Sequence, residues 1–199
     1  MGMERVALAE AGGRVLAEDG VARREQPPFA ASAMDGYAIL SEDRVAGRVL
    51  RVLGEAPAGR AWTGRVGPGE ALRIFTGAPV PEGADCVVIQ EDVTRAGDEI
   101  TLGPAPEGPA HIRPMGVDFH VGARLVAPRR LSPADIALCA AMNLPDLMVR
   151  RRPEVAIIAT GDELVSPGEA PRADQIVASN SYGIKALVEA EGGRARLLP

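Results

Sequence analysis

The stretch Val155-Ala156-Ile157-Ile158-Ala159-Thr160-Gly161-Asp162-Glu163 decides the fold of the C-terminal part of this 199-residue sequence. Its first five residues form a continuous apolar run, which is typical of a strand covered on both faces in a parallel sheet. The pattern that follows predicts a helix from about Tyr182 to Glu191 and a second strand from Arg194 to Leu198. We therefore expect Val155 to Pro199 to form one β-loop-α-β unit.

Polar residues follow this first strand directly. Ligands of open α/β sheets bind outside the carboxyl ends of the strands, which is where Thr160-Gly161-Asp162-Glu163 lies. A carboxylate there could hold a divalent cation. Further on, Ser179-Asn180-Ser181 offers side chains that could cap the helix, although the start of a helix can also bind phosphate. Their spacing alone leaves both roles open.

The same unit also predicts an incomplete domain. Two parallel strands are rarely stable alone, because helices must cover both faces of a parallel sheet. We therefore expect the sequence to stop inside a domain.

Upstream, the sequence favours short strands. The runs Val49–Leu53, Ala71–Phe75 and Cys86–Gln90 are separated by turns that contain Gly and Pro, and they predict a small β domain, either barrel-like or sandwich-like. Gly103–Pro109 is rich in Pro and Gly and is predicted to be a loop. At the start, apolar residues at roughly helical spacing predict a short helix within Val6–Glu18.

A second helix is predicted after Leu131. Ser132 is placed as its N-cap and Pro133 as its first residue, and the helix should end near Asn143. Cys139 lies in this apolar helix and Cys86 in an apolar strand, with no spacing typical of a metal site. We interpret both as buried free thiols.

Composition narrows the class of protein. The formal net charge is −5 with 46% hydrophobic residues, and the chain has few aromatic residues, so nucleic acid is not an expected partner. No segment reaches the length of apolar sequence that a membrane span needs, and the first residues carry no signal-peptide core. We expect a cytoplasmic protein without a membrane partner.

Two further polar clusters have small neighbours that would admit a ligand. They are Ser32 with Met34-Asp35-Gly36-Tyr37, and Thr76-Gly77-Ala78-Pro79. Each alone is also consistent with a turn. Asp118 could equally be a solvated loop carboxylate.

Taken together, these clusters resemble the molybdopterin molybdenumtransferase family, which is related to the E domain of gephyrin. The motifs that carry the resemblance are Pro27-Pro28-Phe29, Ser32–Ala38, Arg73–Asp85, Val87–Glu91, Arg113 with Gly116-Val117-Asp118, Thr160–Leu164 and Ser179-Asn180-Ser181. They occur in family order over almost the whole chain.

The resemblance implies a Mg²⁺-dependent insertion of molybdate into adenylylated molybdopterin, with release of AMP. The residues that match the family's catalytic positions are Asp35, Thr76, Asp118 and Glu163. Those implied in substrate binding are Ser32, Gly77, Asp162, Asn180 and Ser181, and those implied in holding Mg²⁺ are Asp35 and Glu163. The resemblance also implies a homodimer, with molybdopterin adenylyltransferase and molybdoenzyme maturation factors as possible partners.

The implied fold is a multidomain α/β protein. Residues 3–28 and 119–151 would form a helical or linker domain, with an inserted β domain at 29–118. Residues 152–199 would begin a Rossmann-like molybdopterin-binding domain.

The sequence departs from the family at several places. Ala30-Ala31 replace a common Asp-Asn, Asn143 replaces a glycine, and the family's leading helix and later glycine-rich segment are absent. We therefore expect no turnover from these residues alone.

Two alternatives remain. One is a non-catalytic binding or scaffold module of the same fold. The other is a molybdopterin-adenylylating relative, against which the region around Asp35 and Thr76 argues.

Overall fold

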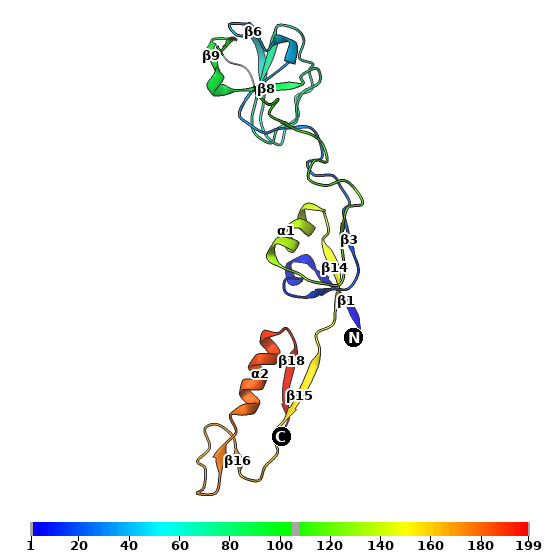
Figure 1. Ribbon diagram of the computed structural model, residues 1–199, viewed down its shortest axis with the longest axis vertical. Coiled ribbons are helices and arrows are strands. Elements are labelled where there is room, and N and C mark those ends of the chain that lie inside the picture. The colour runs from blue at the N-terminus through cyan, green and yellow to red at the C-terminus, as the bar shows by residue number, and fades with distance from the viewer. Residues whose placement is uncertain (1, 105–107, 199) are drawn as a thin grey trace. The chain divides into compact units, whose positions relative to one another are not determined.

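The computed structural model describes residues 2–104 and 108–198 (Figure 1). The chain divides into two compact units. We call Ala22–Ala123 the central unit, and Met1–Val21 with Arg124–Pro199 the terminal unit. The three-domain division with its boundaries near residues 28, 118 and 151 stays a prediction.

The central unit is built on one six-stranded sheet. Its strands are β5 (Gly36–Ile39), β6 (Val49–Ala56), β7 (Glu70–Ile74), β8 (Cys86–Ile89), β9 (Val93–Ala96) and β10 (Glu99–Leu102), in the order β8-β5-β7-β6-β10-β9. All neighbours are antiparallel except β6 and β7, which run parallel. The three predicted strand runs are thus confirmed as β6, β7 and β8.

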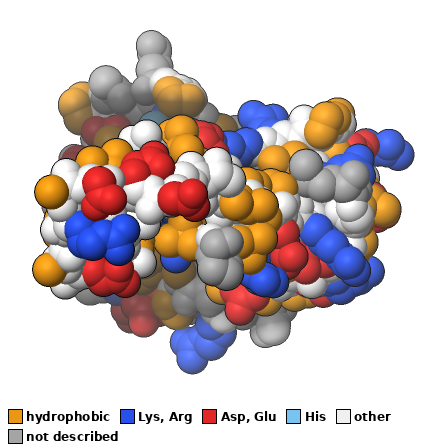
Figure 2. All heavy atoms as spheres, turned by 90° about the horizontal axis from the view of Figure 1, so that it is seen from below, with side chains coloured by type: hydrophobic (Ala, Val, Ile, Leu, Met, Phe, Trp, Pro, Cys, Tyr) orange, Lys and Arg blue, Asp and Glu red, His pale blue; other side chains and the backbone are white. Residues whose placement is uncertain are grey.

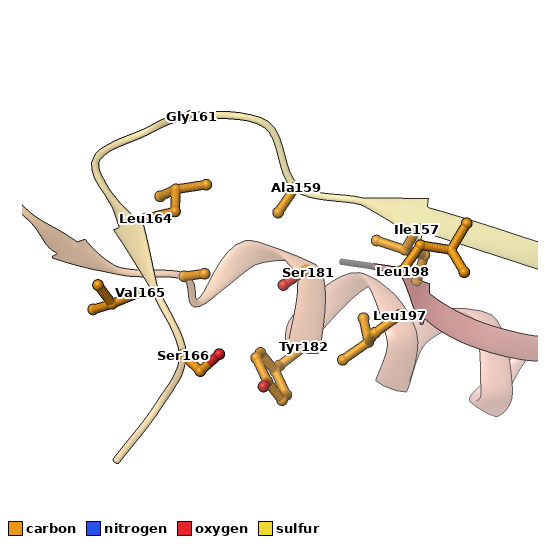
Figure 3. Close-up of a pocket in the computed structure, with 11 residues that line it drawn as sticks. Ile157, Ala159, Gly161, Leu164, Val165, Ser166, Ser181, Tyr182, Leu197 and Leu198 are labelled. Carbon is orange, nitrogen blue, oxygen red and sulfur yellow. The ribbon is translucent and has the colours of Figure 1, made fainter. Parts of the chain in front are cut away.

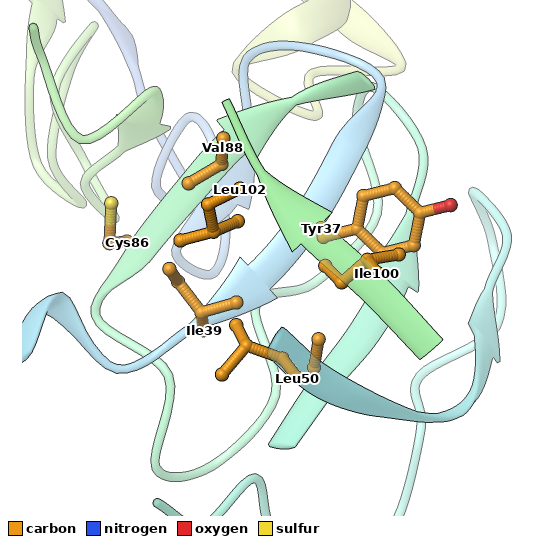
Figure 4. Close-up of a cluster of buried hydrophobic side chains, with 8 residues drawn as sticks. Tyr37, Ile39, Leu50, Cys86, Val88, Ile100 and Leu102 are labelled. Carbon is orange, nitrogen blue, oxygen red and sulfur yellow. The ribbon is translucent and has the colours of Figure 1, made fainter. Parts of the chain in front are cut away.

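Both faces of this sheet are buried. Successive side chains of a strand point to opposite faces, so Tyr37 and Ile39 of β5 join one apolar cluster and Ala38 joins another. Figure 4 shows the first cluster, in which Ile39 lies beside Leu50. Burial raises the pKa of the Cys86 thiol and keeps it protonated. A sheet covered on both faces gives the residues at its strand ends a rigid support.

Short elements complete the central unit. They are β4 (Ala31–Ser32), the 3₁₀ turns η2 (Ser41–Asp43) and η3 (Gln90–Asp92), and β11 (Ile112–Arg113). β11 pairs antiparallel with β4. The predicted loop Gly103–Pro109 includes residues 105–107, which lie outside the described residues.

The terminal unit contains a four-stranded sheet that includes residues for which we predicted a helix. Its strands are β1 (Met3–Ala7), β14 (Asp146–Arg150), β2 (Val15–Leu16) and β13 (Arg129–Arg130), in the order β1-β14-β2-β13, and β12 (Arg124–Leu125) pairs separately with β3 (Gly20–Val21). The predicted helix within Val6–Glu18 is wrong. Only η1 (Leu8–Glu10), a single 3₁₀ turn, forms there. Pairing of β1 along its whole length with β14 overrides the weak helical pattern, and Gly13, at φ 72°, turns the chain into β2.

The helix after Leu131 is confirmed as α1 (Pro133–Ala141). The Ser132 side chain accepts a hydrogen bond from the Asp135 N–H, and the Asp135 side chain accepts one from the Ser132 N–H. This capping box satisfies the first donors of the helix. Asn143 follows the end of the helix with φ 62°, a conformation that asparagine tolerates.

Both cysteines are buried and free, as predicted. Among the described residues of 3–28 and 119–151, α1 is the single α-helix, and the assignment of this region as a helical or linker domain stays a prediction.

The β-loop-α-β unit is confirmed. It consists of β15 (Glu154–Ile158), β16 (Leu164–Val165), β17 (Ile176–Val177), α2 (Asn180–Ala190) and β18 (Arg194–Leu198). β15 runs parallel to β18, and β16 parallel to β17. α2 begins two residues before the predicted start, and the side chain of Ser179, which occupies the N-cap position, makes no capping hydrogen bond. The chain is mostly β with few helices, and a Rossmann-like domain stays a prediction.

Neither described α-helix, α1 or α2, is long and apolar enough to cross a membrane.

Candidate functional site

Asp35 and Thr76 lie together at one end of the central sheet. Asp35 directly precedes β5, Thr76 follows β7, and the antiparallel register pairs Gly36 with Ile74. The main-chain N–H and the hydroxyl of Thr76 both donate to Oδ1 of Asp35, each at 2.8 Å. No described residue donates a hydrogen bond to Oδ2, which leaves that oxygen open to a ligand.

The same contacts keep Asp35 ionised. Its pKa lies below the ordinary value, first because of the Thr76 N–H, then because of the Thr76 hydroxyl, with a smaller effect from the charge of Arg73. Partial burial acts in the opposite direction. At neutral pH the side chain is therefore a carboxylate, suited to binding a cation or accepting hydrogen bonds rather than donating a proton.

Ser32 and Gly77 are close to this pair through the main chain. The Gly77 N–H donates to the Ser32 carbonyl at 2.9 Å, and the Ser32 N–H donates to the Ala78 carbonyl at 3.0 Å. The Ser32 hydroxyl donates to the carbonyl of Met34 at 2.6 Å. Gly77 has φ 81° with open space where a side chain would lie. The two segments therefore form one backbone-lined surface beside Asp35, and the roles of Ser32 and Gly77 in substrate binding stay predictions.

Asp118 belongs to the same unit but is paired. Arg113 donates to Oδ1 of Asp118 at 2.5 Å, and both side chains are partly exposed. The Asp118 N–H donates to the carbonyl of Gln26, and the Gly116 N–H to that of Pro27. Arg113 also sits in β11, opposite Ala31 and next to the pairing partner of Ser32. The sequence motif contained Arg113, but no pattern indicated that it would neutralise Asp118.

The remaining predicted site residues belong to the terminal unit; they are Asp162, Glu163, Asn180 and Ser181. Asp162 and Glu163 are exposed in the loop after β15, at the carboxyl end of that strand as expected. The Glu163 carbonyl accepts from the Ile176 N–H at 2.7 Å, and a Cβ on Gly161 would lie 2.4 Å from Oε2 of Glu163. The absence of a side chain at Gly161 thus lets the Glu163 carboxylate fold back over the loop.

A cavity of about 360 Å³ opens beside this loop (Figure 3). It is lined by the loop after β15, by the start of α2 and by the end of β18; its polar side chains include Ser166, Ser181 and Tyr182. Ser181 is the predicted site residue that faces it. Ser166 and Tyr182 were not predicted, because a serine in a loop and a tyrosine in a helix have no distinctive sequence pattern. Asn180, at the first position of α2, is exposed and does not line this cavity.

The donor set fits Mg²⁺ only as a partly hydrated ion. Across residues 2–104 and 108–198, no group of three or more His, Cys, Asp or Glu side chains is arranged to hold a metal. Mg²⁺ usually keeps several waters and needs only one or two carboxylates with substrate phosphates. The open Oδ2 of the ionised Asp35 meets that requirement.

Comparison with known proteins identifies the family. Residues 1–143 match the family model for the MoeA N-terminal region, domains I and II. The chain is 38% identical over 195 residues to the molybdopterin molybdenumtransferase of Nostoc sp., a match that covers 95% of this chain and 45% of that protein. It is 36% identical over 188 residues to that of Haemophilus influenzae, with 94% and 46% covered.

A solved structure agrees with this relationship. The crystal structure of the molybdopterin biosynthesis MoeA protein from Pyrococcus horikoshii OT3 has a TM-score of 0.88 and 37% identity, and the match covers 100% of this chain and 54% of that one. The chain therefore belongs to the MoeA family, as the motifs predicted. It spans about half the length of the relatives it matches.

Proposed function

We propose that the protein carrying this chain is a molybdopterin molybdenumtransferase of molybdenum cofactor biosynthesis. Family membership and the names of the relatives support this class of enzyme. The proposed reaction is the Mg²⁺-dependent insertion of molybdate into adenylylated molybdopterin with release of AMP. The observation that carries the proposal is the Asp35 carboxylate, ionised, held by Thr76 through one oxygen and open at the other.

The proposed reaction requires a carboxylate that can hold a cation. Molybdate and a phosphoryl-linked pterin are both anions, so a bare carboxylate would repel them unless a cation lay between. Asp35 and Glu163 are the side chains we propose to hold Mg²⁺, which when bound would offset charge on the phosphoryl oxygens. Asp35 itself would bind and orient, because its lowered pKa makes it a poor proton donor.

The remaining residues would bind and position the substrate. The Gly77 turn and the main chain at Ser32 leave room for a bulky ligand to approach. Arg113 would keep Asp118 oriented and reduce local negative charge. Asp162, Asn180 and Ser181 would bind the nucleotide or pterin near the cavity at the end of β15. We further propose that the protein acts as a cytoplasmic homodimer, with molybdopterin adenylyltransferase and molybdoenzyme maturation factors as partners.

The test uses the complete protein. Asp35→Asn and Glu163→Gln should each reduce molybdenum insertion by about 100-fold or more, as expected when a group that stabilises developing charge is removed. Asp98→Asn is the matched control, because Asp98 lies in the hairpin between β9 and β10 and its carboxylate has no described hydrogen bond. AMP release and molybdenum content would be measured with Mg²⁺ and molybdate present.

Retained activity in both Asp35→Asn and Glu163→Gln would contradict the proposed site. Binding of molybdopterin by the wild-type protein without any AMP release would instead support the alternative of a non-catalytic binding module.

A further inference from the structure

Arg73 of β7 connects the two segments that carry Asp35 and Thr76. Its guanidinium carbon lies 5.1 Å from the centre of the Tyr37 ring and 4.9 Å from that of Phe75. Tyr37 is two residues after Asp35, and Phe75 immediately precedes Thr76. The Arg73 guanidinium therefore lies near two aromatic rings, one on the segment that carries Asp35 and one on the segment that carries Thr76. Cation–π attraction favours this arrangement.

The hydrogen bonds of Arg73 reach the main chain around Asp35. One guanidinium nitrogen donates to the Gly36 carbonyl at 3.2 Å, and another donates to the side-chain oxygen of Gln90. The Gln90 N–H in turn donates to the Asp35 carbonyl at 3.1 Å. The two peptide units that follow Asp35, one on each side of Gly36, are thus held, one directly by Arg73 and one through Gln90.

Only an arginine suits this position. A planar guanidinium can stack between two rings while its edge donates several hydrogen bonds in fixed directions. A lysine ammonium carries the same charge, but it is a compact point donor and cannot do both. Arg73 is partly buried against Tyr37, which belongs to the apolar cluster of the sheet, so solvent screens its interactions less than at an open surface.

We infer that Arg73 is a positioning residue: through Tyr37, Gly36, Gln90 and Phe75 it sets the direction in which the Asp35 carboxylate meets Thr76. This inference rests on the proposed function, because it gives that contact a role in orienting the open oxygen of Asp35. Arg73 touches neither the open oxygen nor the substrate surface formed by Ser32 and Gly77 in any described contact. Apart from the direct effect of its charge on Asp35, the described contacts of Arg73 therefore act on the Asp35–Thr76 pair through other residues.

The experiment compares Arg73→Met and Arg73→Lys with the control Arg95→Met. Arg95 lies on the edge strand β9 of the same sheet, and its described hydrogen bond goes to the Gly97 carbonyl. One measurement on the 199-residue chain reports on the contact, namely amide hydrogen exchange of Thr76 relative to Leu72 on the same strand. A second measurement is molybdenum insertion by the complete protein.

We expect the Thr76 N–H to exchange about tenfold faster in both Arg73 variants, the size expected for one weakened hydrogen bond, while Leu72 exchange is unchanged. In the complete protein, kcat should fall about tenfold or more with little change in KM, because orientation rather than binding is lost. Arg95→Met should match wild type throughout.

Unchanged Thr76 exchange in both variants would overturn the inference. So would a general loss of protection across β5 and β7 in both variants, which would show that Arg73 only stabilises the sheet. If Thr76 exchange changes as expected but wild-type protein inserts no molybdenum, the proposed function fails while the positioning by Arg73 stands.

Discussion

Predicted site residues lie both on the central six-stranded sheet and on the β-loop-α-β segment of the terminal unit, which we call the β15-α2-β18 unit. The two regions support these residues differently. Around Asp35 and Thr76, both faces of the sheet are covered by buried apolar clusters. In the β15-α2-β18 unit the described sheet has two strands, and Ile158, Ile184 and Leu187 are exposed. On the face of the molecule drawn in Figure 2, apolar side chains lie at the surface among acidic and basic ones.

This difference shows which structural features hold site residues in place before a ligand binds. In the central unit, strand register and two cores determine how Asp35 meets Thr76 before any ligand binds. In the β15-α2-β18 unit, Asp162 and Glu163 sit on an exposed loop whose described support is a short pair of parallel strands. We therefore expect substitutions of buried residues to lower the free energy of unfolding strongly in the first region, and substitutions of the exposed residues of the second region to change it little.

The largest expected effect is that of Gly36→Ala. A Cβ at Gly36 would lie 2.1 Å from the carbonyl oxygen of Val88, a backbone atom that pairs β8 with β5. The strands would have to separate, so we expect a loss of more than about 4 kcal/mol in the free energy of unfolding, at the extreme of single substitutions. Urea unfolding would be followed by the fluorescence of Trp62, the single tryptophan of the chain, which packs against the core of the central unit.

Gly12→Ala is the control for this clash, because no atom lies within 4 Å of a Cβ placed there. Its stability, measured by circular dichroism, should stay within about 0.5 kcal/mol of wild type. A stable, cooperatively folded Gly36→Ala protein would contradict the strand packing described above.

A pair of leucine truncations would compare the regions directly. Leu72 is fully buried in the central sheet, so Leu72→Ala should cost about 3 kcal/mol through lost burial and a residual cavity. Leu187 on α2 is 65% exposed, so Leu187→Ala should cost less than about 0.5 kcal/mol. Equal losses, determined from urea unfolding curves, would show that the exposed face of α2 is covered in solution.

Gly183→Ala should stabilise the β15-α2-β18 unit. Gly183 lies inside α2, and no atom lies within 4 Å of the position that an alanine Cβ would take there. Alanine is preferred over glycine in a helix interior by about 0.5–1 kcal/mol. Slower amide hydrogen exchange along α2 would be the readout. Gly193→Ala is the contrast, because its Cβ would lie 2.7 Å from Val188, and faster exchange is expected there.

The smallest expected effect is a shift in the titration of Asp35. Thr76→Val removes the hydroxyl donor but keeps the main-chain N–H, which is the larger cause of the lowered pKa. The pKa of Asp35 should rise yet stay below its ordinary value, as measured by NMR titration of the carboxyl carbon.

The sign of the pH dependence follows from the direction of this shift. Because the folded pKa is lowered, the carboxylate contributes to stability above the unfolded pKa, and that contribution is lost as pH falls through the folded pKa. Thr76→Val should therefore weaken the acid dependence of stability, and an unchanged titration would show that the hydroxyl does not bind Asp35 in solution.

Local signals in the sequence predicted the elements that depend on neighbouring residues. Ser132 and Pro133 predicted the start of α1, because capping involves residues within one turn. The apolar run beginning at Val155 predicted β15 for a similar reason. By contrast, the helix predicted within Val6–Glu18 failed because β1 pairs with β14, a partner about 140 residues away, as in the contact of Arg5 with Asp146.

The sequence by itself determined the chemistry that each position can offer and, through its ordered motifs, the family to which the chain belongs. It named Asp35 and Thr76 as separate candidates. Only the tertiary structure decided that Thr76, 41 positions away in the sequence, donates two hydrogen bonds to one oxygen of Asp35. It also decided that Arg73 lies 5.1 Å and 4.9 Å from the centres of the Tyr37 and Phe75 rings. The physical reason is that strand register, established by burial on both faces of the sheet, sets such distances, and register is a property of pairs of strands rather than of either strand alone.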